Sequence, residues 1–453
     1  MKIVTPPLFV EDGDSFQNDI LDRESFGEAL LNLVVRSNDA LVISLDGKWG
    51  EGKTTFVKMW QGLLSESDIP NIYIDAFSID YVDDAFISVV SSILSYAEDS
   101  VVNEHRDKVV ELKEKSKQIG CKLLSWTTRI AVKVATLGIV KNSDIDELIE
   151  IKNDLSKTAS DFVGDFVEER ILEHSKDIEL IVSFREILSE IPSKLQKDCK
   201  KPLVVIVDEL DRCKPTFAVE MLEKIKHLFS VKNVVFVLVM NKMQLEESIK
   251  SVYGVNVDAH TYLQKFINIE AKLPIKIESG RICNIRKYAK RLIDLHEIET
   301  WGDSSNIVDN IDIIGNHFKL SLRQLEKVFT IISIFYATRS KQHLRIVPYV
   351  TFLSVIKVVD PQMFDDILYQ RVSYGYICEK LRLPNIQDVS ENDRPLHWFL
   401  QWLRYGLLSD IEFEGLSTDD NVRNLGSSIS AYHVGRKQLV PMLALQLSMF
   451  AVV

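Results

Sequence analysis

Cysteines are few in this sequence and far apart. The 453 residues contain five, with no Cys-x-x-Cys pair and no cluster of cysteine with histidine. This spacing argues against a zinc site and against a disulfide framework, and it fits a reducing compartment. Residues 1–7 also lack the long apolar core of a secretory signal. We therefore expect a cytoplasmic protein.

A long uninterrupted apolar run is also missing. The best candidate, residues 119–140, is interrupted by Lys122, Arg129 and Lys133. A charge near the centre of a membrane span costs about 2.5–3.5 kcal/mol on insertion scales. We interpret the segment as an amphipathic or buried helix, with a helix lying on a membrane surface as the alternative. The prediction is no transmembrane span, with peripheral membrane contact left open.

Positive charge is in deficit, because 54 Lys and Arg stand against 66 Asp and Glu, a net charge of −12. This balance argues against a surface that coats nucleic acid, although a local basic groove stays open. The 46% hydrophobic and 26% charged content is ordinary for a globular chain of two or three domains. Nucleic acid is therefore not the favoured partner.

The sequence does contain one phosphate-binding loop. Residues 41–55 read LVISLDGKWGEGKTT, an apolar run of strand length followed by Gly-x-x-x-x-Gly-Lys-Thr, and residues 56–60 can continue as a helix. The glycines would adopt backbone angles closed to residues with a Cβ, so that successive N–H groups turn inward around an anion. Lys53 would hold the β- and γ-phosphates of ATP, and Thr54 would ligate Mg²⁺. A chance glycine-rich turn is disfavoured because strand, loop and helix are all in place. The predicted nucleotide contacts are Gly47, Trp49, Gly50, Glu51, Gly52, Lys53, Thr54 and Thr55.

An acidic pair follows a second apolar run. Residues 203–207 read LVVIV, which suits a strand buried on both faces of a parallel sheet, and Asp208 and Glu209 come directly after it. Open α/β sheets place their ligand sites at this end of the strands. Asp208 would hold Mg²⁺, and Glu209 would polarise the water that attacks the γ-phosphate. The alternative is an acidic pair that only caps the strand end.

The remaining pattern predicts a parallel α/β sheet of five strands alternating with helices. A helix over 25–35 precedes the loop, and further strands are expected at 71–77, 233–241 and 266–271. Asn241, at the end of one strand, is either a sensor of the γ-phosphate or the N-cap of the next helix, and one residue can do both. A long helical insertion, about 85–198, separates the phosphate loop from the acidic pair.

Three segments together resemble the KAP family of P-loop NTPases: GKWGEGKTT at 47–55, VDELDRC at 207–213 and TYLQKFI at 261–267. The resemblance covers about residues 15–340 and implies an ATPase of the additional-strand, catalytic-glutamate class. It implies a core over 1–275 that includes the insertion and a helical lid over 276–340. Beyond the resemblance, the apolar and helical character of the chain indicates a helical C-terminal domain over 341–453. The family insertion often carries two transmembrane segments, and this chain departs from that pattern.

The resemblance also points to two arginines. Arg212 could reach the nucleotide of a neighbouring subunit or hold Asp211 in place, and Arg323 looks like the lid arginine of related ATPases. A guanidinium can spread the γ-phosphate charge in the transition state, and a structural salt bridge is the alternative for both residues. The basic segment 281–291 favours a solvated helix face over a phosphate contact. The final run, 439–453, favours a buried helix or an oligomer contact.

The sequence therefore predicts a Mg²⁺-dependent ATP hydrolase that acts as a conformational or assembly switch, with Glu209, Lys53, Asn241 and Arg323 as catalytic residues. The resemblance implies a role in bacterial signalling or anti-phage defence, with a homo-oligomer or an operon-encoded protein as partner. The alternatives are a nucleotide-binding scaffold with little hydrolysis, a small-molecule or nucleoside kinase, and a nucleic-acid-stimulated ATPase. Glu209 disfavours the scaffold, and the acidic pair disfavours the kinase.

Overall fold

The fold is described from a computed structural model. It describes residues 1–6, 15–37, 39–81, 85–100, 201–226, 230–275, 277–278, 281–389, 393–417 and 420–450, together with residues 110, 114, 182, 185, 186, 188 and 189. Most of the predicted helical insertion, including the segment 119–140, lies outside the described residues.

Five parallel strands form the central sheet in the order β2-β3-β4-β1-β5. This confirms the predicted α/β fold with a parallel five-stranded sheet. Every residue of β3 and β4 is buried, as expected for strands covered on both faces. The strands are β1 (Leu41–Asp46), β2 (Asn71–Asp75), β3 (Leu203–Asp208), β4 (Val234–Met240) and β5 (Ile269–Lys272).

The last strand begins later than the predicted residue 266. The backbone N–H groups of Phe266 and Ile267 bond to the carbonyl of Leu263, so these residues still belong to the turn that ends the preceding helix. Both side chains are buried in the core under the sheet. Asn268 joins the sheet first, because its backbone N–H and its side-chain oxygen both bond to the backbone of Val42. Apolar character alone could not separate the buried turn from the strand.

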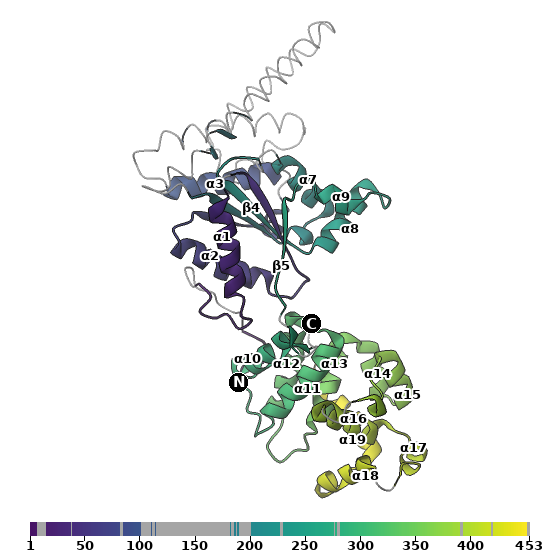
Figure 1. Cartoon of the computed structure of the whole chain (residues 1–453). Coiled ribbons are helices and arrows are strands. Elements are labelled where there is room, and N and C mark those ends of the chain that lie inside the picture. Colours follow the sequence, from purple (N-terminus) through teal and green to yellow (C-terminus); the bar gives the residue numbers. More distant parts are fainter. Residues whose placement is uncertain are drawn as a thin grey trace.

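Helices cover both faces of the sheet (Figure 1). Alternate strand residues point to opposite layers, so Val205 and Phe236 pack on one side while Ile206 and Val237 pack on the other. The first layer contains α3 (Ala85–Ser100), α7 (Pro215–Ile225), α8 (Lys242–Tyr253) and α9 (Ala259–Leu263), and the second contains α1 (Glu24–Arg36) and α2 (Lys53–Glu66). Short 3₁₀ turns follow β2 and β3, namely η1 (Phe77–Ile79) and η4 (Leu210–Arg212).

The rest of the chain forms a helical body that lies below the α/β layers in Figure 1. A two-stranded hairpin, β6 (Ile277–Glu278) and β7 (Arg281–Ile282), leads into it. The predicted lid region contains α10 (Cys283–His296), α11 (Ser304–Phe318) and α12 (Leu322–Ala337). Beyond it lie α13 (Val347–Val359), α14 (Pro361–Leu368), α15 (Tyr374–Leu381), η5 (Ile386–Asp388), α16 (Arg394–Leu407), α17 (Asp410–Glu414), α18 (Asn421–Asn424), η6 (Leu425–Tyr432) and α19 (Arg436–Ser448).

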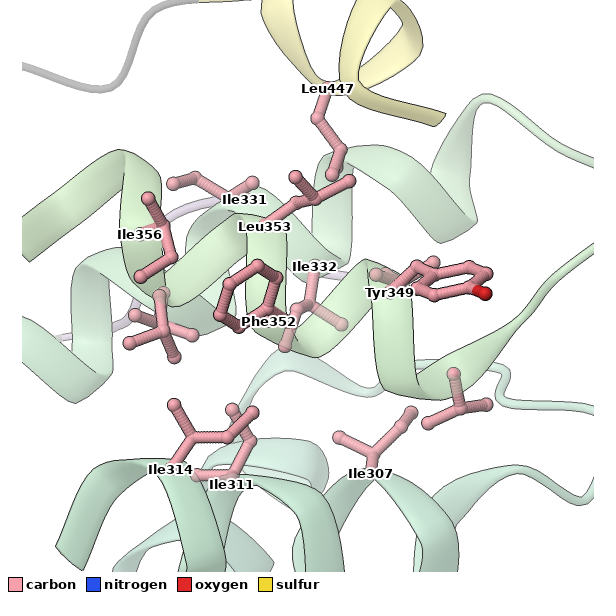
Figure 2. Packing of buried hydrophobic residues seen from close by; sticks show 14 of the residues in the cluster. Ile307, Ile311, Ile314, Ile331, Ile332, Tyr349, Phe352, Leu353, Ile356 and Leu447 are labelled. Atoms are coloured by element: carbon pink, nitrogen blue, oxygen red, sulfur yellow. The ribbon is translucent and has the colours of Figure 1, made fainter. Parts of the chain in front are cut away.

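One hydrophobic core joins the lid helices to the C-terminal helices. Figure 2 shows Phe352 and Leu353 of α13 among isoleucines of α11 and α12, with Leu447 of α19 packing from above. The domain boundary at residue 340 stays a prediction, and the buried cluster extends across it. Within the final apolar run, the α19 side chains at 439, 440, 443, 444 and 447 are buried in this core.

Among the described residues, no helix combines the length and the apolar character needed to cross a membrane.

The basic face of α10 is partly neutralised by ion pairs. Arg286 pairs with Asp309 and Asp312, and Lys287 pairs with Asp22 just before α1. The side chains of Arg286 and Lys287 remain 44% and 39% exposed, in line with the solvated helix face predicted for residues 281–291.

The fully buried His296 ties the first residues of the chain to the end of α10. Its Nδ1 lies 2.8 Å from the carbonyl oxygen of Lys2, and its Nε2 lies 2.9 Å from the hydroxyl of Thr5. Burial lowers the pKa of His296 below its ordinary value, so the unfolded chain takes up this proton at a higher pH than the folded chain does.

The His296 contribution to stability should therefore be complete above about pH 6.5 and be lost as the pH falls through the folded pKa. We expect the unfolding free energy of the wild type to fall more steeply with acid than that of His296→Gln, by at most about 1.4 kcal/mol per pH unit. Urea unfolding at pH 7.5 and pH 5.5 measures this difference. Equal acid sensitivity in both proteins would contradict the assignment.

Candidate functional site

The phosphate loop connects the end of β1 to the start of α2. Gly50 and Gly52 both have φ +79°, which is the left-handed region that favours glycine. Gly47 does not adopt a positive φ, so the predicted reason for that glycine was wrong. Space is what Gly47 provides, because a Cβ there would lie 3.1 Å from Glu51 Oε2 and 3.3 Å from Lys53 Cγ. The loop thus curls tightly over its own lysine.

The Lys53 ammonium lies inside the curve of the loop. It donates hydrogen bonds to the carbonyl oxygens of Gly47, at 2.6 Å, and Lys48, at 3.3 Å. Burial lowers the pKa of Lys53, while the nearby carboxylates of Asp211, Asp208 and Glu51 oppose that shift. A buried cation at the N-terminus of α2 gives this position a strong preference for an anion.

Asp208 ends β3 as an almost completely buried carboxylate, 1% exposed. Tyr73 of β2 donates its hydroxyl proton to Asp208 Oδ2 at 3.0 Å, and the Thr54 hydroxyl also bonds to this carboxylate. Burial raises the pKa of Asp208, whereas these hydrogen bonds, the backbone N–H of Glu209 and the charge of Lys53 lower it. Thr54 and Asp208 therefore meet, which places the two predicted magnesium ligands together.

Glu209 follows in the left-handed conformation, with φ 61° and ψ 24°. This backbone turn directs its side chain back over η4, where Glu209 Oε1 lies 2.7 Å from an Arg212 guanidinium nitrogen. Burial raises the pKa of Glu209, and the charge of Arg212 lowers it. Arg212 therefore pairs with Glu209, while Asp211 accepts a hydrogen bond from the Trp49 indole instead.

Asn241 occupies the N-cap position of α8, next to the phosphate loop. Its carbonyl accepts the N–H groups of Gln244 and Leu245, but its side chain makes no capping hydrogen bond. Asn241 does not line the cavity described below. The sensor role stays a prediction.

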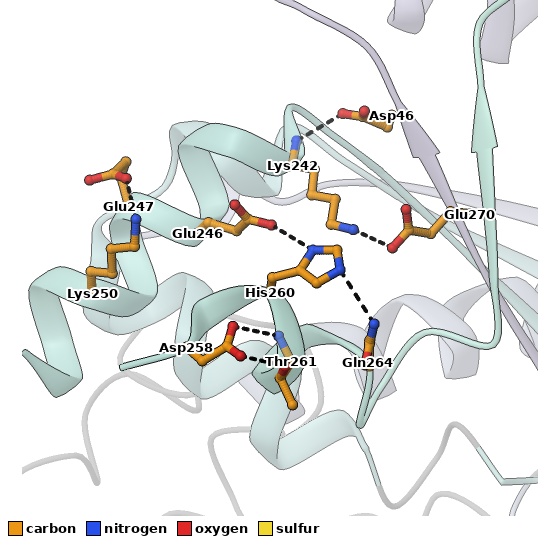
Figure 3. A network of polar contacts seen from close by, with 10 residues as sticks. All are labelled: Asp46, Lys242, Glu246, Glu247, Lys250, Asp258, His260, Thr261, Gln264 and Glu270. Carbon is orange, nitrogen blue, oxygen red and sulfur yellow. Dashed lines mark hydrogen bonds and ion pairs between the residues drawn. The ribbon is translucent and has the colours of Figure 1, made fainter. Parts of the chain in front are cut away.

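A polar network holds this end of the sheet together (Figure 3). The backbone N–H of Lys242 donates to Asp46 Oδ1 at 2.9 Å, and its ammonium pairs with Glu270 of β5. Three strand ends, those of β1, β4 and β5, are thus linked around the start of α8. Asn241 directly precedes Lys242 in the chain.

The start of α12 rests directly on the phosphate loop. The backbone N–H of Arg323 donates to the carbonyl of Gly50 at 3.3 Å, and Ser321 with Gln324 forms a capping box at this helix terminus. The side chain of Arg323 lines the cavity beside the loop. The predicted lid helix therefore contacts the core at the loop itself.

A cavity of about 290 Å³ lies between the loop, the end of β3 and the lid. Among the predicted site residues it is lined by Trp49, Gly50, Gly52, Lys53, Thr54, Thr55, Asp208, Glu209 and Arg323. Gly47 and Glu51 lie outside it and shape the loop, where Glu51 Oε2 accepts the backbone N–H of Lys48 at 2.8 Å.

Several cavity residues were not predicted from the sequence. Arg23, 4% exposed, donates to the loop carbonyl of Glu51 at 2.9 Å, and its Nε has no hydrogen-bond partner among the described residues. From the lid, Tyr288 donates to Glu326 Oε1 at 2.5 Å. The remaining unpredicted lining residues are Asn18, Asp19, Ile20, Leu21, Met59 and Leu322, whereas Asp211 and Arg212, which also line the cavity, belong to the segment 207–213 singled out in the sequence. No motif marks the unpredicted positions, because each reaches the cavity through tertiary packing.

Gly50 offers a direct test of the contact between loop and lid. A Cβ at this position would lie 2.8 Å from Arg323 Cβ and would also need a left-handed backbone, which costs about 1–2 kcal/mol. We expect Gly50→Ala to push α12 off the loop and to weaken nucleotide binding, as measured by calorimetry. Gly254→Ala is the matched control, because φ there is +100° but nothing lies within 4 Å. Equal binding by both variants would show that the contact does not matter.

The parallel sheet, the loop on β1 and the acidic pair on β3 together define a P-loop NTPase. A model of the KAP family P-loop domain matches residues 23–339, so the chain belongs to this family. The match confirms the resemblance predicted from the three segments.

Individual relatives add little about function. The chain is 32% identical over 139 residues to the uncharacterised protein MJ0182 of Methanocaldococcus jannaschii, a match that spans 29% of this chain and 69% of that protein. Two solved structures from Aeropyrum pernix align over nearly the whole chain. The ORC2 protein in ADPNP-ADP complexes has TM-score 0.36 at 12% identity, covering 98% of this chain and 97% of its own. The ORC1 protein in complex with DNA has TM-score 0.32 at 11% identity, covering 97% and 91%. Similarity at this level supports no statement about the ligand or partners of this chain.

Proposed function

We propose that the chain is a Mg²⁺-dependent ATP hydrolase that works as a conformational or assembly switch. One observation carries the proposal: Lys53, Thr54, Asp208, Glu209 and Arg323 all line the same cavity, although they come from three distant parts of the sequence. An ammonium, a hydroxyl, two carboxylates and a guanidinium form the set of groups that phosphoryl chemistry requires.

The donor set fits Mg²⁺. Thr54 and Asp208 offer adjacent oxygen atoms in hydrogen-bond contact, and Mg²⁺ prefers oxygen ligands while keeping several waters. When bound, Mg²⁺ would neutralise charge on the β- and γ-phosphates. Tyr73 holds the Asp208 carboxylate from the side, which limits its rotation.

The lining of the cavity also suits a nucleoside. Leu21, Met59 and Leu322 contribute apolar surface, while the hydrogen-bonded Tyr288 and Glu326 contribute polar groups. Ligand sites commonly combine apolar walls with a few polar groups that fix orientation. With the phosphates at Lys53, these groups would contact the adenosine of ATP.

Hydrolysis would then depend on Glu209. Its carboxylate would accept a hydrogen bond from a water and orient it for in-line attack on the γ-phosphate. The charge that develops would be balanced by Lys53 and Arg323, so positioning and electrostatics supply most of the catalysis. Because α12 contacts the carbonyl of Gly50, loss of the γ-phosphate would directly change the contact between the phosphate loop and the lid.

The lid would pass this conformational change to a second copy of the chain or to a separate protein partner. The family resemblance predicts a role in bacterial signalling or anti-phage defence. No residue of this chain specifies it.

ATP binding and steady-state phosphate release, measured with Mg²⁺ and with EDTA, test the proposal. We expect slow turnover that requires Mg²⁺. ATP binding without turnover in any condition would favour a scaffold over a hydrolase. Strong stimulation by nucleic acid with a steep salt dependence would favour a nucleic-acid-stimulated ATPase.

A further inference from the structure

The ion pair between Glu209 and Arg212 is unexpected in a hydrolytic site. Both side chains are largely buried, with 17% and 29% of their surfaces exposed, and both line the cavity. A carboxylate that already accepts a charge-assisted hydrogen bond is a weaker acceptor for water. In this arrangement Glu209 is therefore held back from the role proposed for it.

Arg212 also lies within electrostatic range of the phosphate position. Arg212 and Lys53 line the same cavity, so the guanidinium shares this space with the ammonium that would hold the β- and γ-phosphates. The side chain of Arg212 thus pairs with a carboxylate in the cavity where a phosphate with higher negative charge is expected. Arginine binds phosphate with the same fork of N–H groups that it offers to carboxylate.

The backbone around this pair is anchored. Asp211, directly before Arg212, accepts the Trp49 indole N–H from the phosphate loop, and the N–H of Arg212 donates to the carbonyl of Glu209 at 3.0 Å. The turn is therefore fixed at both ends, and a change of partner by Arg212 requires only side-chain rotation.

We propose that Arg212 senses the γ-phosphate within its own subunit and positions Glu209 accordingly. With ADP or no nucleotide, Arg212 pairs with Glu209 and the carboxylate is withheld. When ATP is bound, the guanidinium moves to the γ-phosphate, and Glu209 is released to orient water. This inference rests on the proposed ATP site and adds a gate that ties the water-polarising carboxylate to the presence of the γ-phosphate.

The test compares the dissociation constants of ADP and of the non-hydrolysable β,γ-imido analogue of ATP, both with Mg²⁺. Arg212→Gln should lower the preference for the analogue over ADP by about 10-fold or more, the size of one hydrogen bond to a charged group. Arg212→Lys should restore part of the preference. Arg371→Gln, which removes an ion pair between the exposed Arg371 and Asp366 of α14, is the matched control and should change nothing.

Unchanged ADP affinity in Arg212→Gln shows that the variant is folded. An unchanged preference for the analogue would overturn the proposal. The proposal would also be overturned if Arg212→Gln lowered the preference only at protein concentrations where the chain self-associates, because Arg212 would then act on a neighbouring subunit. The measurement does not depend on hydrolysis. Failure of this inference can therefore be distinguished from failure of the proposed function, in which the wild type would bind ATP without hydrolysing it.

Discussion

Glu209→Gln should lower ATP turnover by about 100-fold or more, because a positioned general base contributes about 10²–10⁴-fold. The amide keeps the size of the side chain and loses its basicity and charge. ATP binding should persist, since Lys53 and the loop are untouched and Arg212 gains freedom to contact phosphate. Phosphate release and equilibrium ATP binding, measured on the same preparation, test both parts.

The matched control is Glu247→Gln, which removes an exposed carboxylate paired with Lys250 on α8 and should leave turnover unchanged. Residual turnover near the wild-type rate in Glu209→Gln would show that another group orients the water. Asn241, which precedes Lys242 at the end of β4, would then be the first residue to replace.

Lys53→Ala should weaken ATP binding by about 10- to 100-fold, because a hydrogen bond to a charged group contributes about 1.5–3 kcal/mol. The effect should be larger for ATP than for adenosine, since the ammonium acts on the phosphates alone. Fluorescence titration with labelled ATP, with unlabelled adenosine as competitor, measures this difference.

Lys58→Ala removes an exposed ammonium from the same helix and should leave ATP affinity as in the wild type. If Lys53→Ala binds ATP with wild-type affinity, the phosphates do not lie at this loop. The cavity would then need another occupant.

The sheet could be predicted because its central strands carry their signal locally. Residues 203–207 and 234–240 are unbroken apolar runs, and each proved to be a fully buried strand. The phosphate loop and the acidic pair were likewise recognisable, because their residue types and spacing follow from what a phosphate and a metal ion need.

The rest of the site depends on contacts between distant residues. Tyr73 reaches Asp208 across 135 positions, and Arg23 reaches the loop from the turn before α1. Such contacts leave no periodicity in the sequence. The pairing of Arg212 with Glu209 depends on the left-handed backbone at Glu209, which cannot be predicted from the residue type.

The error at Gly47 has a similar cause. A glycine can be required for its backbone angles or for the space beside it, and only the folded loop distinguishes the two. The lid was predicted as helical, but the hydrogen bond from the N–H of Arg323 in α12 to the carbonyl of Gly50 could be identified only from the folded structure.

Single-turnover hydrolysis tests the central claim most directly, with the wild-type chain in excess over γ-labelled ATP and Mg²⁺. The account predicts that bound ATP is converted to ADP and labelled phosphate in one exponential phase, and that Glu209→Gln holds the same ATP intact. ATP that stays bound and unhydrolysed on the wild type over hours would contradict the claim that this site is built for hydrolysis.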